Sequence, residues 1–134
     1  MTNGTRLTDE EIDRLSGREL DEAVALAMGF VWSESEGWLN VPDSWAGDAL
    51  GFRVRRTEDN ERHIPGACLP KWHDNLGAAM GLLLGAQLYV QVSIGQSAVV
   101  VYQNFKARNP ISGGPKKDAA TVICRAYLKL KNRE

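Results

Sequence analysis

The chain has 134 residues, of which 43% are hydrophobic and 25% charged, a composition typical of one folded domain and not of a disordered chain. Its net charge of −1 argues against nucleic-acid binding over the whole surface. The charge is uneven, because residues 1–30 hold seven acidic and three basic residues, whereas residues 101–134 hold two acidic and eight basic ones. This asymmetry is compatible with an anion-binding surface, with self-association, or with two solvated helix faces.

No targeting or membrane segment is expected. The N-terminal residues lack the apolar run of a signal peptide, so Cys68 and Cys124 are expected to be free thiols in a reducing cytoplasm. Residues 75–105 contain no charged residue, but Gln, Ser and Asn side chains interrupt them repeatedly. The stretch is therefore not interpreted as a membrane span.

The first elements are predicted to be a short helix over 8–15 and a longer helix over 17–28. Thr8 and Ser16 each begin a capping-box pattern with glutamate three residues later. Apolar residues then recur at helical spacing, and Gly29 suits the position just after a helix end.

Residues 30–70 are predicted to be strand and loop. Residues 30–32 are a candidate strand, and 33–70 read as loop with short strands. Residues 52–55 alternate like a strand, whereas 56–63 are charged and are expected to form an exposed turn.

A further helix is expected to start at Pro70 and to end near Gly85. Its apolar stripe consists of Trp72, Leu76, Ala79, Met80 and Leu83. Gly77, Gly81 and Gly85 are spaced by four and leave one smooth edge, which we interpret as a site of tight packing.

The clearest local pattern is a β-hairpin over 88–105. A two-residue turn at Gly95–Gln96 would place Ile94 opposite Ser97 and Val92 opposite Val99. One face of the hairpin is then apolar, formed by Leu88, Val90, Val92, Ile94, Val99, Val101 and Phe105. The apolar face is expected to pack on helices.

The second hairpin face carries polar and aromatic side chains that suit a flat, anionic ligand. Tyr89 and Tyr102 offer stacking area, Lys106 and Arg108 offer positive charge, and Asn104 lies on the same face. Two other interpretations remain open: an exposed sheet face, and a face covered by a partner subunit.

A final helix is predicted over 117–131, with an apolar stripe formed by Ala119, Val122, Ile123, Ala126 and Leu130. Lys116 and Lys117 lie at its start, after a Gly113–Gly114 turn whose backbone N–H groups are expected to be open. This combination suits a phosphate group, although a mobile basic loop without a ligand is the alternative. The Gly-Lys-Ser/Thr of a P-loop is missing, so nucleotide hydrolysis is not indicated.

Arg125 lies at the border of the same apolar stripe. It is expected either to snorkel or to pair with an acid of the first helix, and the alternative is contact with a ligand between subunits.

The sequence does not indicate a catalytic or metal site. His63, Cys68 and His73 are spaced by five, but no fourth ligand falls at a recognised metal-site spacing. No nucleophile elbow or HExxH motif is present. We therefore expect a non-enzyme without catalytic residues, metal or cofactor.

Three segments together resemble the phage ABA sandwich domain family. Residues 17–25, followed by Met28–Gly29 and Trp32, resemble the opening of that family. Residues 69–80 resemble its second helix and 119–128 its closing helix, so that the resemblance covers most of the chain apart from 40–68. It implies a small bacteriophage protein of the host cytoplasm, with a single α+β domain over 1–134. It also implies an antiparallel sheet between two helical layers, an α/β/α sandwich, and transfers no catalytic residue.

By analogy with small phage proteins that sequester defence signals, the expected function is a sponge. It would bind a cyclic oligonucleotide or a cyclic ADP-ribose isomer without cleaving it. The protein is expected to be a homo-oligomer and to bind neither a membrane nor duplex nucleic acid. The candidate ligand-binding residues are Tyr89, Tyr102, Asn104, Lys106, Arg108, Lys116, Lys117 and Arg125.

Two other functions remain open. One is inhibition of a host protein by direct binding, through exposed Trp38 or Trp45 or through the acidic first helix. The other is a phosphoesterase that acts on the same signals and depends on a metal or on His63 or His73.

Overall fold

The computed structural model describes residues 7–32, 37–42, 55–56, 62–65, 68–85, 90–103 and 109–132. Its helices are α1 (Asp9–Arg14), α2 (Gly17–Ala27), α3 (Leu76–Gly85) and α4 (Ala119–Asn132), and a 3₁₀ helix η3 (Lys116–Asp118) leads into α4. Its strands are β1 (Val31–Trp32), β2 (Trp38–Asn40), β3 (Arg55–Arg56), β4 (Arg62–Pro65), β5 (Gln91–Ile94), β6 (Ala98–Tyr102) and β7 (Ser112–Pro115).

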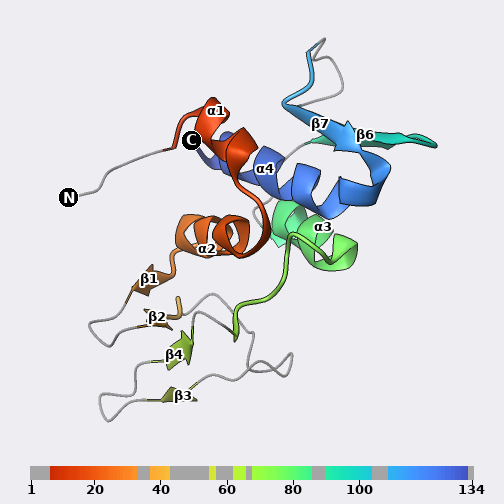
Figure 1. The fold of residues 1–134 in the computed structure, drawn as a ribbon. Helices are drawn as coiled ribbons and strands as arrows, with labels where there is room; N and C mark the ends of the chain where they lie inside the picture. Colours follow the sequence, from red (N-terminus) through yellow and green to blue (C-terminus); the bar gives the residue numbers. More distant parts are fainter. Residues whose placement is uncertain are drawn as a thin grey trace.

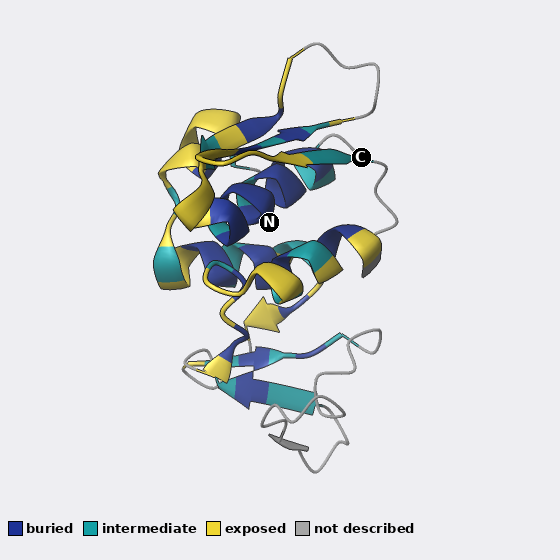
Figure 2. Cartoon of the chain, turned by 90° about the vertical axis from the view of Figure 1, so that its right-hand side faces the viewer, coloured by how far each residue is buried: buried dark blue, intermediate teal, exposed yellow. Residues whose placement is uncertain are grey.

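The strands form two antiparallel sheets, one with the order β1-β2-β4-β3 and one with the order β5-β6-β7. Figure 1 shows α4 between the β6–β7 strands on one side and α2 and α3 on the other, with β1–β4 beyond α2. The expected α+β class with an antiparallel hairpin sheet is therefore confirmed. In the described part of the chain the helices occupy the middle of the molecule and the sheets lie outside them (Figure 2). This order differs from the expected α/β/α sandwich, in which one sheet lies between two helical layers, because α4 is buried on several sides and takes the centre.

The central position of α4 follows from its burial on more than one side. The residues of its predicted stripe are all buried, but so are Ala120, Cys124, Tyr127 and Leu128, which point elsewhere on the helix. Helix α4 accordingly contacts α1, α2, α3, β6 and β7. A helix that is apolar on several sides needs a covering layer on each of them, which places it at the centre of the fold.

The N-terminal helices start and stop close to the predicted positions. Thr8 forms a complete capping box with Glu11, as expected. Ser16 is the residue before α2, but its side chain makes no capping hydrogen bond, so the second predicted capping box is wrong. Gly29 adopts a φ of 106°, a conformation that glycine tolerates best, and the chain then enters β1.

Two predicted boundaries between residues 56 and 76 are wrong. The expected exposed turn contains the start of β4, whose Ile64 is fully buried opposite Leu39 of β2. Helix α3 begins at Leu76 and not at Pro70, because the Asn75 side chain accepts a hydrogen bond from the backbone N–H of Ala78 and so starts the helix there.

The hairpin is present with a changed register. Ile94 pairs with Val99 and Val92 with Val101, and Gly95 N donates to Ala98 O, so the turn is formed by Gln96 and Ser97. The predicted turn at Gly95–Gln96 is therefore one residue too early. Moving the turn by one residue shifts each cross-strand partner by two positions, so every side chain of the described strands stays on its predicted face.

None of the helices in the described ranges is long and apolar enough to cross a membrane.

Candidate functional site

The sheet β5-β6-β7 has one face against α4 and one face turned away from it. Val99 and Val101 of β6 are fully buried, and β6 contacts α4. Side chains alternate along a strand, so Val100 and Tyr102 belong to the opposite, outer face, where both are half-buried. Gln91 pairs with Tyr102 and shares this face. We call it the outer sheet face.

The eight candidate residues divide into two groups. Tyr102, Lys116, Lys117 and Arg125 belong to the described part of the chain. The predictions for Tyr89, Asn104, Lys106 and Arg108 fall on positions outside the described residues.

Lys116 and Lys117 lie in η3, immediately after β7, and both side chains are exposed. The backbone N–H of Lys116 donates to Ser97 O at 3.0 Å, so η3 is attached to the turn of the hairpin. Within the described ranges, neither ammonium group has a hydrogen bond or an ion pair. The structure thus brings two positive charges, unpaired among the described residues, to one end of the hairpin sheet.

The residues before η3 form strand β7 and not the expected open turn. Gly113 and Gly114 pair with Val100 and Val99, so their backbone belongs to the sheet. Glycine is needed at 114 because a Cβ there would lie 2.8 Å from Cγ2 of Val122 in α4. The expected phosphate site in a Gly-Gly turn is therefore replaced by a sheet edge that packs closely on α4.

The Arg125 side chain forms hydrogen bonds within the fold. Its Nε and Nη2 donate to Leu15 O at 3.2 and 2.8 Å, which ties α4 to the connection between α1 and α2. The expectation is that Arg125 either snorkels or pairs with an acid of the first helix; its partner is instead the carbonyl oxygen of Leu15.

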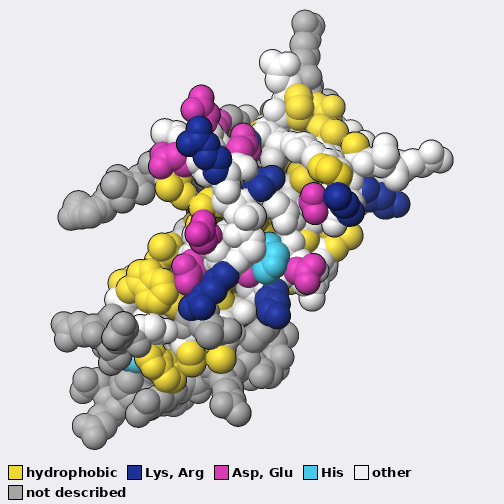
Figure 3. Space-filling view, in the orientation of Figure 1, with side chains coloured by type: hydrophobic (Ala, Val, Ile, Leu, Met, Phe, Trp, Pro, Cys, Tyr) yellow, Lys and Arg dark blue, Asp and Glu magenta, His cyan; other side chains and the backbone are white. Residues whose placement is uncertain are grey.

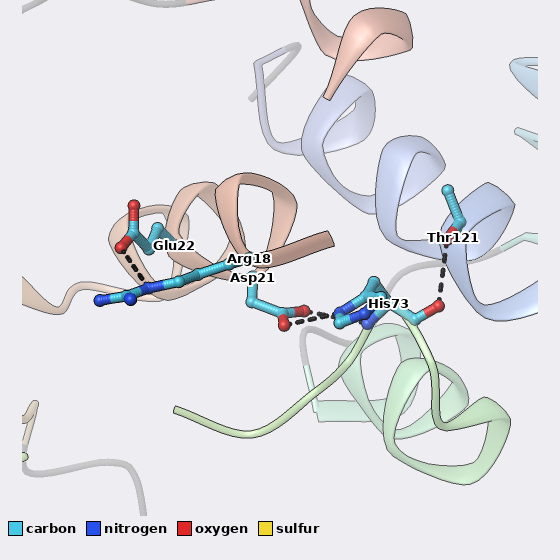
Figure 4. A network of polar contacts seen from close by, with 5 residues as sticks. All are labelled: Arg18, Asp21, Glu22, His73 and Thr121. Carbon is cyan, nitrogen blue, oxygen red and sulfur yellow. Dashed lines mark hydrogen bonds and ion pairs between the residues drawn. The ribbon is translucent and has the colours of Figure 1, made fainter. Parts of the chain in front are cut away.

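A polar site that the sequence analysis did not single out joins α2 to the segment before α3 (Figure 4). Asp21 Oδ1 accepts from the backbone N–H of His73 at 2.9 Å, and Asp21 Oδ2 lies 2.7 Å from His73 Nδ1. Thr121 of α4 donates from Oγ1 to His73 O at 3.0 Å. Arg18 and Glu22 form an exposed ion pair beside it, one helical turn apart on α2.

The Asp21–His73 pair combines a buried acid with a partly exposed base. The Asp21 side chain is 5% exposed and that of His73 is 25% exposed. Burial raises the pKa of Asp21, while the hydrogen bonds and charge of His73 and the charge of Lys71 act in the opposite direction. Because Nδ1 faces the carboxylate, Nε2 is the ring nitrogen left for a ligand.

The signal for this pair was the position of Asp21 on α2. Asp21 precedes the buried Val24 and Ala25 by three and four residues, so its Cβ lies at the border of the buried stripe. Nothing local in the sequence indicates which residue meets Asp21, because His73 is 52 positions away.

The three residues considered as metal ligands do not come together as a group. His63 lies in β4, Cys68 is exposed before α3, and His73 is bound to Asp21. Among the described residues, no three His, Cys, Asp or Glu side chains are placed to hold a metal ion.

Comparisons of the chain with protein-family models, with curated proteins and with solved structures found no match. The resemblance to phage ABA sandwich proteins is therefore still a prediction.

Proposed function

We propose that this protein is a phage anti-defence protein that binds a nucleotide-type immune signal in the host cytoplasm and sequesters it without cleavage. The supporting observation is that one sheet carries two kinds of group. Tyr102 lies on its outer sheet face, and at its end η3 carries two lysines that are unpaired among the described residues. Tyrosine provides a surface for base stacking, and ammonium groups pair with phosphate oxygens.

The spacing of these groups favours an extended ligand. Pro115, just before Lys116, pairs with Ala98, whereas Tyr102 lies four residues further along β6. At about 3.3 Å per residue this separation is about 13 Å. A ligand that contacts both ends must therefore have a base and a phosphate well apart, as in a cyclic oligonucleotide or a cyclic ADP-ribose isomer.

The proposal is tested by a thermal-shift screen with cyclic oligonucleotides, cyclic ADP-ribose isomers, ADP-ribose and plain nucleotides. A ligand at 100 to 1,000 times its Kd should stabilise the protein by about 3 to 4 kcal/mol. The bound compound is then recovered after denaturation of the protein. Intact compound supports sequestration, and cleaved compound would show that the protein is an enzyme.

The site is tested with the double variant Lys116→Ala/Lys117→Ala. Because both side chains are exposed and unpaired in the described structure, we expect the ligand-induced shift to be lost and the Tm of the free protein to stay nearly unchanged. Arg14→Ala is the control, since it removes an exposed positive charge from α1. Ligand binding by the double variant as tight as that of Arg14→Ala would contradict the assignment of the site.

A second candidate function, inhibition of a host protein by direct binding, is favoured by an exposed apolar surface. Leu26, Val31 and Trp32 are 45%, 58% and 43% exposed at the end of α2 and in β1, an edge strand. Trp38, which we had considered for this role, is half-buried, and Trp45 lies outside the described residues. Capture of one host protein by the wild type, lost in Val31→Ser/Trp32→Ser, together with no response to any nucleotide, would favour this candidate.

A further inference from the structure

His73 is held in place by contacts from two helices. Asp21 of α2 bonds both its backbone N–H and its ring, and Thr121 of α4 bonds its carbonyl oxygen. The ring therefore has a defined orientation before any ligand arrives. Preorganised donors bind at a lower entropic cost than flexible ones do.

The same contacts decide which ring nitrogen remains available to a ligand. The carboxylate can only accept, so Nδ1 carries the proton toward Asp21 and Nε2 is left free of that contact. Histidines that bind ligands or metals commonly have a carboxylate on the other ring nitrogen, which fixes the tautomer and orientation. When the ring is protonated, Nε2–H is a charged donor backed by a buried negative charge.

Two lysines belong to the segments that meet at His73. Lys71 lies two residues before His73, is exposed, and is close enough for its charge to act on Asp21. Lys117 precedes Thr121 by four residues, about one helical turn, and Thr121 contacts His73 directly. Asp74 and Asp118 belong to the same two segments and limit the net positive charge. Figure 3 shows Lys and Arg side chains interspersed with Asp and Glu side chains over this face of the molecule.

We propose that His73 Nε2, with Lys71 and Lys117, binds a phosphate group of the ligand. The inference rests on the proposed function and places the phosphate end of the ligand where η3, α4 and the segment before α3 meet. Lys116 links this point to the hairpin turn through its hydrogen bond to Ser97.

The test follows the histidine ring signals by NMR while inorganic pyrophosphate is added at constant ionic strength. The chain has two histidines, and His63 in β4 is the internal control. We expect the His73 ring signals to shift saturably while those of His63 stay in place. Lys117→Ala should weaken pyrophosphate binding about tenfold, as expected for the loss of one charge-assisted hydrogen bond. Arg14→Ala should leave it unchanged.

Three results would overturn the inference: an unmoved His73 signal, equal movement of both histidines, or unchanged binding in Lys117→Ala. His73→Gln removes the ring and keeps a polar side chain, and its fold is checked by circular dichroism. If nucleotides bind His73→Gln as tightly as wild type, the inference is wrong and the proposed function stands. If pyrophosphate shifts His73 while no nucleotide binds, the phosphate site is supported and the proposed ligand class is wrong.

Discussion

Polar side chains in the interior of this protein join elements that are far apart in the sequence. Lys129 of α4 is buried, yet its Nζ donates to Ile111 O at 2.9 Å and lies 2.7 Å from Asp13 Oδ1. Arg125 and the Asp21–His73 pair work in the same way, each satisfying a donor or acceptor on a neighbouring element. A buried polar group without such a partner would destabilise the fold by about 1 to 3 kcal/mol.

Cys124 gives a prediction for alkaline pH. Burial raises the pKa of this thiol to about 12 from an ordinary value of 9.0, so the folded protein holds the proton more tightly than the unfolded chain. The free energy of unfolding is therefore not reduced by this thiol below about pH 9. It falls as the pH rises from about 9 to 12, by up to about 4 kcal/mol in all.

The measurement is denaturant unfolding of wild type and Cys124→Ala at pH 7, 9 and 10.5. Other titrating groups are common to both proteins, so the difference between them isolates the thiol. We expect the advantage of the wild type to shrink above pH 9. A difference in free energy of unfolding that stays constant with pH would contradict the burial of this thiol.

Among the elements, the helices and the hairpin were predictable and β7 was not. The alternation of apolar and polar residues over 88–105 predicted both hairpin faces, because successive side chains in a strand point to opposite faces of the sheet. Strand β7 has the sequence Ser-Gly-Gly-Pro, which has low strand propensity, and it is a strand because β6 pairs with it. Its two glycines also let it lie close to α4.

Gly114→Ala should therefore destabilise the protein, by about 1 to 3 kcal/mol, because its Cβ would lie 2.8 Å from Val122 Cγ2. Gly113→Ala is the control, since its Cβ would meet Val99 O at an ordinary 3.6 Å. Thermal and denaturant unfolding of the two variants should differ clearly, and adding Val122→Ala should recover part of the loss in Gly114→Ala. Equal stability of the two alanine variants would argue against the close packing of β7 on α4.

At the scale of the whole molecule, one hydrophobic core joins both sheets to the helices. Leu39 and Ile64 of the first sheet belong to the same buried cluster as Val99 and Val101 of the hairpin sheet. Helices α2 and α4 lie between these ends and connect them (Figure 2).

This continuity predicts a single cooperative unfolding transition. Leu39→Ala should destabilise the whole protein by about 2 to 5 kcal/mol and lower the Tm seen by every probe. Val101→Ala, at the other sheet, should lower the same transition. The measurement compares far-ultraviolet circular dichroism with tryptophan fluorescence during heating. Two separate transitions, each sensitive to only one of the two substitutions, would contradict a single core.

The candidate site shows the same division between local and distant information. Tyr102, Lys116 and Lys117 follow from local patterns, because a strand alternation and two adjacent lysines are visible in the sequence. His73 does not follow from a local pattern. Its proposed role in binding depends on the contacts with Asp21 and Thr121, which are 52 and 48 residues away.

The sequence by itself determined the α+β class, helices α1, α2 and α4, the end of α3 and both faces of the hairpin. These features depend on residue spacing over one or two turns or along one strand, where apolar periodicity and capping residues act locally. Only the tertiary structure decided the pairing of β7, the central position of α4 and the contact between Asp21 and His73. Each of these features depends on which surfaces bury one another from water, and distant segments of the chain acquire such contacts only when they pack together.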